Sequence, residues 1–340
     1  MPITIKDIAK KTGVNHSTVS RALHGSNLIS VETAERIRKA AREMGYQPSA
    51  AARSLKTRRS KVLGVIVSSI EDPFFSEIVF GIEAVAQDNG YSLFIGSSQH
   101  DNQRERKIVQ TMLEHRTDGV IVCSSSFSVE HGRQLLDHGF PIVVVNHQAT
   151  ENFHYSIFHD DIDGSRQITR HLIGLGHQRI AYLGNSVSGR TTLDRLSGFQ
   201  AEMEAAGLPI PEGYVQHVPG GTALEGRDGL QRFKGLVEFP TAIICYNDMI
   251  AIGLLQACHE AGIRVPQELS ITGFDNISFS AFTHPPLTTF DQPKSSIGAE
   301  AARLLFELID AEQKVTPGTQ YVKILKGSLL VRSSTAAALQ

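Results

Sequence analysis

The sequence of 340 residues contains no tryptophan and only three cysteines, Cys123, Cys245 and Cys258. These cysteines are odd in number, far apart and set among apolar residues, so they predict buried thiols and exclude a disulfide framework. The chain also lacks any run of about 18 apolar residues, which excludes a transmembrane helix. Lys10 and Lys11 lie where a secretory signal peptide needs an apolar stretch. We therefore expect a cytoplasmic protein that does not engage a membrane.

Two common signatures of catalysis are missing as well. The sequence has no glycine-rich phosphate-binding loop of standard spacing and no Gly-x-Ser-x-Gly turn for a nucleophilic serine. We therefore expect no enzymatic activity and no cofactor. One short segment does gather residue types that ligate metals. Its members are His154, His159, Asp160, Asp161 and Asp163.

The positive charge of the chain is concentrated at its N-terminal end. Residues 1–61 contain thirteen Lys or Arg against four Asp or Glu, a net charge of +9, whereas the whole chain carries −2. An acidic body therefore follows a basic head. This split is typical of a protein whose head alone approaches a polyanion. The alternative is a solvated basic helical bundle.

Residues 4–25 have the pattern of two short amphipathic helices joined by a tight turn at Gly13. Apolar residues recur at helical spacing on one face of each helix, Asn15 can cap the second helix, and Gly25 can end it. The outer face of the second helix keeps hydrogen-bonding side chains of the kind that contact base edges and phosphates. The pattern predicts a helix-turn-helix that binds duplex DNA. The outer-face residues are His16, Ser17, Ser20 and Arg21.

A third helix is predicted between the cap Ser30 and the stop Gly45, and it would complete a three-helix core. Residues 49–61 then form a basic segment that is too short to hold a helix alone in water. Leu55 lies in this segment next to Lys56. Two roles are open for this leucine: it packs on the next domain, or it is an apolar wedge inserted between base pairs in the minor groove.

From Val62 onward, short apolar runs alternate with helical stretches in two successive series. The alternation predicts an α/β core of two doubly wound halves, each with a parallel sheet, and a ligand cleft at the C-terminal ends of their strands. The predicted strands span 62–69, 91–98, 118–123 and 141–146 in the first series and 179–186, 214–218, 241–248 and 269–276 in the second. The helices predicted in the second series span 166–175, 194–206, 222–236 and 249–262.

Many separate motifs along nearly the whole chain resemble the lactose/galactose repressor family. They include IKDIAKKTGVNHSTVSRALHG at the start, YNDMIAIG and GFDN in the core, and PPLTTFDQP and LLVRSS towards the end. The resemblance implies a homodimeric transcriptional regulator, a palindromic operator, and a core similar to periplasmic sugar-binding proteins. It also implies that the chain passes between the halves near residues 161, 290 and 323. Because the segment with potential metal ligands resembles the first passage, we expect no metal there.

The domain organisation follows from the same resemblance. We expect a helix-turn-helix head over 1–48, a hinge helix and linker over 49–61, a first core subdomain of 62–161 and 291–323, and a second of 162–290 and 324–340. The sequence after LLVRSS lacks the leucine heptads that join dimers into tetramers, so a dimer is expected.

The resemblance also assigns DNA contacts to residues of the head. His16 and Ser17 occupy the two positions that chiefly set base preference in the family, and Arg21 matches an arginine that contacts bases and phosphates. Leu55 matches a leucine that family members insert at the centre of the operator, which favours the wedge role. Further DNA contacts are implied for Thr4, Ser20, Asn27 and Lys56.

Effector contacts are implied for eight residues of the core. Among them, Arg195 offers a planar fork of donors and Asp275 accepts two hydrogen bonds, so the pair suits the vicinal hydroxyls of a sugar beneath an aromatic ring. Two alternatives stay open: Arg195 and Asp275 form an ion pair between the halves, and the two phenylalanines are plain core residues. The eight residues are Phe74, Phe75, Asn146, Arg190, Arg195, Asn247, Asp275 and Gln292.

The expected effector is therefore a carbohydrate, and Arg190 leaves room for a sugar acid or a phosphorylated sugar. A purine is less favoured, because residues 218–226 offer no aromatic ring from the second half. Two other classes of protein fit the same core. A regulator controlled by a phosphorylated protein corepressor would keep the head, whereas a sugar-binding transport protein would need an export signal in its place.

Overall fold

The computed structural model describes residues 3–46, 59–124, 127–146, 155–187, 189–310 and 321–338. They belong to two compact units, the head (Met1–Ser60) and the core unit (Lys61–Gln340). Leu55, Lys56 and His154, together with most of the predicted hinge helix, lie outside the described residues. Within the described ranges, no helix has both the length and the apolar character needed to span a membrane.

The head consists of three short helices, α1 (Ile5–Thr12), α2 (His16–Leu23) and α3 (Val31–Glu43). All three contribute apolar side chains to one small core, which confirms the predicted helix-turn-helix with a third supporting helix. The side chains at its centre are Ile8, Val19, Ala22, Ala34 and Ile37.

The ends of these helices carry the caps predicted from the sequence. Asn15 Oδ1 accepts a hydrogen bond from Ser17 N at 3.1 Å, and Ser30 Oγ accepts one from Thr33 N at 3.4 Å. Each bond satisfies a backbone donor that has no partner within the first helical turn. Gly13 ends α1 with a φ of 68°, a left-handed conformation that favours glycine, and it makes the tight turn into α2.

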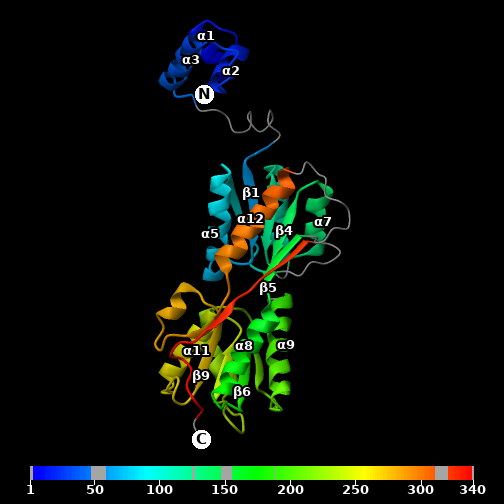
Figure 1. Cartoon of the computed structure of the whole chain (residues 1–340), viewed down its shortest axis with the longest axis vertical. Helices are drawn as coiled ribbons and strands as arrows, with labels where there is room; N and C mark the ends of the chain where they lie inside the picture. Colours follow the sequence, from blue (N-terminus) through cyan, green and yellow to red (C-terminus); the bar gives the residue numbers. More distant parts are fainter. Residues whose placement is uncertain are drawn as a thin grey trace. The chain divides into compact units, whose positions relative to one another are not determined.

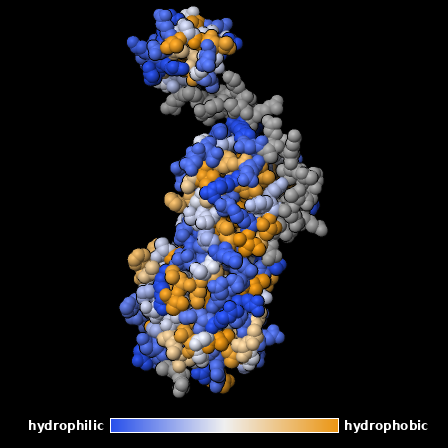
Figure 2. Space-filling view, in the orientation of Figure 1, coloured by the Kyte–Doolittle hydropathy of each residue, from blue (hydrophilic) through white to orange (hydrophobic). Residues whose placement is uncertain are grey.

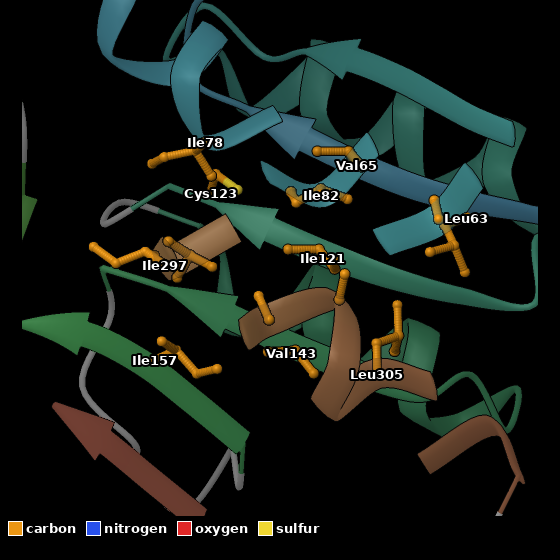
Figure 3. Close-up of a cluster of buried hydrophobic side chains, with 14 of the residues drawn as sticks. Leu63, Val65, Ile78, Ile82, Ile121, Cys123, Val143, Ile157, Ile297 and Leu305 are labelled. Carbon is orange, nitrogen blue, oxygen red and sulfur yellow. The ribbon is translucent and has the colours of Figure 1, made fainter. Parts of the chain in front are cut away.

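The first half of the core unit is a six-stranded parallel sheet with the strand order β11-β5-β4-β3-β1-β2. Figure 3 shows side chains of its central strands meeting those of α5 and α12, including Ile78, Ile297 and Leu305, in one apolar cluster. The strands are β1 (Val62–Val67), β2 (Ser92–Ser97), β3 (Gly119–Cys123), β4 (Ile142–Val145), β5 (Tyr155–His159) and β11 (Tyr321–Leu325). The helices are α5 (Pro73–Asp88), α6 (Asn102–Glu114), α7 (Val129–Asp137) and α12 (Lys294–Asp310).

The second half has the strand order β12-β10-β9-β8-β6-β7, in which β12 alone of these six runs antiparallel to its neighbour. Its strands are β6 (Ile180–Asn185), β7 (Val215–Val218), β8 (Ala242–Cys245), β9 (Ser270–Asp275), β10 (Thr288–Asp291) and β12 (Ser328–Leu330). Its helices are α8 (Asp161–Gly174), α9 (Gly189–Ala205), α10 (Ala223–Gly229) and α11 (Asp248–Glu260), with short 3-10 turns η1 (Leu230–Arg232) and η2 (Ser278–Ala281). The predicted fold class, a helix-turn-helix head before two parallel-sheet halves, is confirmed.

The chain passes from one half to the other three times. The passages lie between β5 and α8, between β10 and α12, and between β11 and β12, where Figure 1 shows the chain running from one half into the other. On the face seen in Figure 2, hydrophilic residues cover most of the core unit and hydrophobic residues form smaller patches between them.

Several elements differ from the sequence prediction. Strands β5, β10, β11 and β12 were not predicted, and α8 and α9 each begin five residues before the expected start. Asp160 explains the early start of α8, because its Oδ1 accepts a hydrogen bond from Asp163 N at 2.9 Å and caps the helix. The helix expected over 222–236 ends at Gly229 and continues only as the turn η1.

All three cysteines are buried and free, as predicted. Burial in apolar surroundings raises the pKa of the Cys123 and Cys258 thiols to about 12 and that of Cys245 well above its ordinary value. The three thiols are therefore protonated at neutral pH.

Candidate functional site

In the head, helix α2 presents its N-terminal turn and one face to solvent. His16, Ser17 and Arg21 are exposed, and Ser20 is half-buried. Ser17 lies in the first turn of α2, where the positive end of the helix dipole attracts phosphate oxygens. Thr4 is also exposed, and its Oγ1 donates to Asp7 Oδ2 at 2.7 Å in the capping box of α1. The arrangement leaves the side chains of α2 available for a nucleic acid, and Asn27 lies exposed beyond its end.

In the core unit, a cavity of about 590 Å³ lies where the C-terminal ends of both sheets face each other. This is the position at which doubly wound sheets bind ligands, and the volume suits a small organic molecule. Residues that follow strands in each half form its walls. Six of the eight predicted effector contacts line it, and these are Phe74, Phe75, Asn146, Arg195, Asn247 and Asp275.

The start of α5 places two aromatic rings in this cavity. Asp72 Oδ1 accepts a hydrogen bond from Phe74 N at 3.0 Å, and Pro73 occupies the first helical position, so the helix begins at the cavity wall. Phe74 and Phe75 then meet edge to face, with ring centroids 5.2 Å apart. Phe74 is buried in the core of the first half and the half-buried Phe75 packs against that core, so a core role describes part of what each ring does.

Arg195, on α9, is buried beneath the second half of the cavity. Its Nε donates to Asp161 Oδ1 at 2.7 Å, another nitrogen donates to the Tyr246 carbonyl, and a third lies 3.5 Å from Asp275 Oδ1. Its guanidinium also stacks on the Phe274 ring, 3.8 Å from the centroid. Burial alone would lower the pKa of Arg195, yet Asp161, Tyr246 and Asp275 raise it above its ordinary value.

The partners of Arg195 correct one expectation from the sequence. Arg195 and Asp275 both belong to the second half, and so does Asp161 at the start of α8. Their ion pairs therefore lie within one half and do not join the two. Burial opposes the charge of Asp161, but His159 and Arg195 outweigh it and hold the pKa of that carboxyl at about 2.

Asp275 combines a buried carboxyl with a free oxygen. Gln292 Nε2 donates to Oδ1, the atom that Arg195 also approaches, and no described residue hydrogen-bonds Oδ2. Burial raises the pKa of Asp275 well above its ordinary value, although the positive charges of Arg195 and Lys294 oppose this effect. Oδ2 is therefore an acceptor that a ligand in the cavity can use.

Asn247 and Asn146 differ in the number of hydrogen bonds that their side-chain amides make within the protein. Asn247 caps α11 by accepting a hydrogen bond from Ile250 N at 2.9 Å, and its Nδ2 donates to the Gly221 carbonyl at 3.0 Å. Asn146 Oδ1, in contrast, is buried and has no hydrogen-bond partner among the described residues. A buried amide oxygen without a partner costs free energy, so Asn146 favours a ligand that donates a hydrogen bond.

Two of the predicted effector contacts do not line the cavity. Arg190 is half-exposed, pairs with Asp194 at 2.7 Å, and lies beside a separate cavity of about 30 Å³. Gln292 is buried and contacts Asp275 from behind the cavity wall. His159, Asp160 and Asp161 also border the small cavity, and no group of three metal-ligating side chains is assembled within the described ranges.

Several residues that line the cavity were not predicted from the sequence, notably Asp72, Gln99, His100 and Asn185. A signal for them exists, because each ends a strand, follows a strand or caps the next helix, at the sheet edge where ligands bind. Four of the seven non-glycine residues with positive φ among the described residues also line the cavity. Strained backbone of this kind gathers at functional sites. The four are Gln99, His100, Asn146 and Asp275.

Comparison with known proteins supplies the family. Residues 4–49 match the family described as bacterial regulatory proteins, lacI family, and residues 169–335 match a periplasmic binding protein-like domain. The HTH-type transcriptional repressor PurR of Pasteurella multocida (strain Pm70) is 35% identical over 316 residues, covering 92% of this chain and 93% of that repressor.

Two solved structures share the fold over nearly the whole chain. The Lac repressor dimer bound to operator and the anti-inducer ONPF matches with a TM-score of 0.86 and 26% identity, covering 99% of this chain and all of that one. The complex of the transcriptional regulator CelR with cellobiose matches with a TM-score of 0.73 and 25% identity, covering 98% and 99%. The chain therefore belongs to the lacI family of bacterial regulatory proteins and is a transcriptional repressor with an N-terminal DNA-binding domain.

Proposed function

We propose that this repressor is a homodimer that binds a palindromic operator and that a neutral carbohydrate in the core cavity changes its operator affinity. The observation that carries the proposal is the donor and acceptor set of the cavity. Asp275 Oδ2 and the buried Asn146 Oδ1 are acceptors without a hydrogen-bond partner among the described residues, and Phe75 offers an apolar ring at the same cavity. Hydroxyl groups on an apolar ring skeleton complement both features.

The charges of the cavity favour a neutral ligand over an anionic one. Its wall contains the acidic residues Glu71, Asp72, Glu225 and Asp275. Among the described lining residues, Arg195 is the only lysine or arginine. The guanidinium of Arg195 is already shared between two carboxylates, Asp161 and Asp275. Arg190, which left room for a sugar acid or a phosphorylated sugar, is paired with Asp194 outside the cavity. An anionic ligand would lie beside four acidic side chains and one cation that is already paired, which is unfavourable in a partly dehydrated site.

A purine is the nearest competing small molecule. Tyr246 supplies an aromatic ring from the second half, outside residues 218–226. The Arg195 guanidinium lies over this ring, 4.6 Å from its centroid, and occupies one of its faces. The carbohydrate proposal is supported further by the CelR relative, whose solved structure is a complex with a sugar.

A ligand screen followed by operator titration tests the proposal. Thermal unfolding of the full chain should be measured with neutral pentoses, hexoses and disaccharides, with uronic acids and sugar phosphates, and with purines and nucleosides. A ligand present at about 100 times its Kd stabilises the folded protein by about 2.7 kcal/mol, so the correct class stands out clearly.

We expect a neutral sugar to raise the unfolding temperature and to change the affinity for an operator selected from random duplexes. Stabilisation by purines or by sugar phosphates alone would overturn the choice of ligand. No hit in any class, together with operator affinity that responds to a phosphorylated protein, would replace the small-molecule effector with a protein corepressor.

A further inference from the structure

Lys294 is a buried lysine at the second passage between the halves, and no motif in the sequence pointed to it. It is the first residue of α12 and is 3% exposed. A buried ammonium group is costly unless it is paired and hydrogen-bonded. Lys294 meets this requirement with oxygen atoms from both halves of the core unit.

The shortest contacts to the second half are made with backbone, and the Asp291 carboxylate on β10 lies 3.8 Å from Lys294 Nζ. Lys294 Nζ donates to the carbonyl oxygen of Asp275 and, at 3.0 Å, to that of Asn276. Both residues have positive φ, 111° for Asp275 and 51° for Asn276. Lys294 therefore holds a strained turn at the end of β9, directly behind the carboxyl group that faces the cavity.

The contact to the first half is an ion pair. Lys294 Nζ lies 3.4 Å from Glu77 Oε2, on α5 one turn beyond the two phenylalanines of the cavity wall. Helices α5 and α12 run side by side in the first half (Figure 1). They approach so closely that a Cβ atom on Gly81 would overlap the Ser295 carbonyl, and one on Gly298 would overlap the Ile78 carbonyl. Lys294 is therefore fixed to the first half at its backbone while its ammonium group reaches the second.

We propose that Lys294 is a positioning residue that sets the angle between the two halves and ties the end of β9 to α5. Through this tie, a change in the position of Asp275 on ligand binding moves the start of α5. The proposal rests on the proposed function for the ligand in the cavity, but the link itself exists without a ligand and can be measured in its absence.

The test is the distribution of distances between spin labels on the two halves of the full chain. Asp137→Cys on α7 and Glu204→Cys on α9 offer exposed sites, one in each half. The three native cysteines are buried, so labelling is confined to the engineered sites. Dilution of labelled chains with unlabelled protein removes distances between subunits.

Four variants are compared with the parent protein in this background. Lys294→Met removes the charge at similar length, Lys294→Arg restores it, and Glu77→Gln breaks only the contact to α5. Lys323→Met is the matched control, because Lys323 pairs with Glu300 of the same helix α12 but within the first half.

We expect Lys294→Met to broaden the distance distribution by about twofold or to shift its centre, since removing a tie between two bodies adds arrangements to the ensemble. Glu77→Gln should broaden it less, Lys294→Arg should return it towards the parent, and Lys323→Met should leave it unchanged. Glu77 is 40% exposed, so Glu77→Gln keeps the test valid if Lys294→Met does not fold. Distributions unchanged in both Lys294→Met and Glu77→Gln, or equal broadening by Lys323→Met, would overturn the proposal.

Discussion

Asp275→Asn should weaken effector binding and at the same time leave the ligand-free protein as stable as the parent or more so. The amide keeps an oxygen for the bonds that Gln292 and Arg195 now make with Oδ1, but it replaces the open acceptor Oδ2 with an N–H donor. A hydrogen bond from a ligand hydroxyl to a charged acceptor contributes about 1.5–3 kcal/mol. Its loss should weaken ligand binding roughly 10- to 150-fold, at about 1.4 kcal/mol per tenfold change.

The expected stability change has the opposite sign because of the pKa of Asp275. Burial raises that pKa in the folded protein, so the ionised carboxyl at neutral pH opposes folding. Removing the charge should therefore raise the free energy of unfolding of the ligand-free protein. Binding-site residues often reduce stability in this way.

Calorimetric titration with the sugar found by the screen, and urea unfolding at pH 7, measure the two effects. Asp194→Asn is the matched control, since Asp194 pairs with Arg190 away from the main cavity. Unchanged ligand affinity in Asp275→Asn would remove Asp275 from the site. A loss of ligand-free stability beyond about 1 kcal/mol, the centre of the distribution for ordinary mutations, would show that its charge is needed for folding.

Three further predictions follow from other parts of the chain. The affinity of the full protein for operator should fall by orders of magnitude between about 50 and 200 mM salt, because Lys and Arg of the head release counterions from phosphates. Filter binding across this range measures the affinity, and an affinity that does not change with salt would contradict the prediction. Burial raises the pKa of Asp248 from its ordinary value of 3.8 to about 7, so its contribution to stability is full below pH 4 and is lost as the pH rises to 7. Urea unfolding over that range should show a smaller decline in Asp248→Asn, and equal declines would refute the assignment. Asn15→Ala should destabilise the head by about 1 kcal/mol through loss of the cap on α2. The helical circular-dichroism signal of the head should then melt at a lower temperature, and an unchanged melting temperature would mean that the cap is dispensable.

The helix-turn-helix and eight of the strands could be predicted because their signals are local. The caps Asn15 and Ser30 are chemical properties of single residues, and parallel strands buried on both faces give continuous apolar runs such as Val62–Val67. Strand β10 could not be predicted in this way. Its residues Thr288 and Thr289 are polar yet fully buried, because Thr335 and Asp248 satisfy their hydroxyl groups from distant parts of the chain.

The candidate site shows the same division. Residues at the C-terminal ends of strands, such as Asn146 and Asp275, could be placed in the cleft from topology and the family resemblance. The sequence could not reveal that Arg190 forms an ion pair with Asp194, or that Arg195 has two carboxylate partners in its own half. The charge of the cavity, and with it the choice of a neutral ligand, depends on these pairings. Lys294 could not be predicted for the same reason, since its partners are Glu77 and two backbone carbonyls that only the fold brings together.

Operator affinity measured with and without a saturating neutral sugar, on one preparation of the full protein, tests the central claim most directly. A ligand changes DNA affinity only through its differential binding to two arrangements of the protein, which typically corresponds to about 1–3 kcal/mol, or roughly 5- to 150-fold. We predict a change in this range for the parent protein and its loss in Asp275→Asn at the same sugar concentration. Operator affinity that stays constant while calorimetry shows the sugar bound would contradict the account.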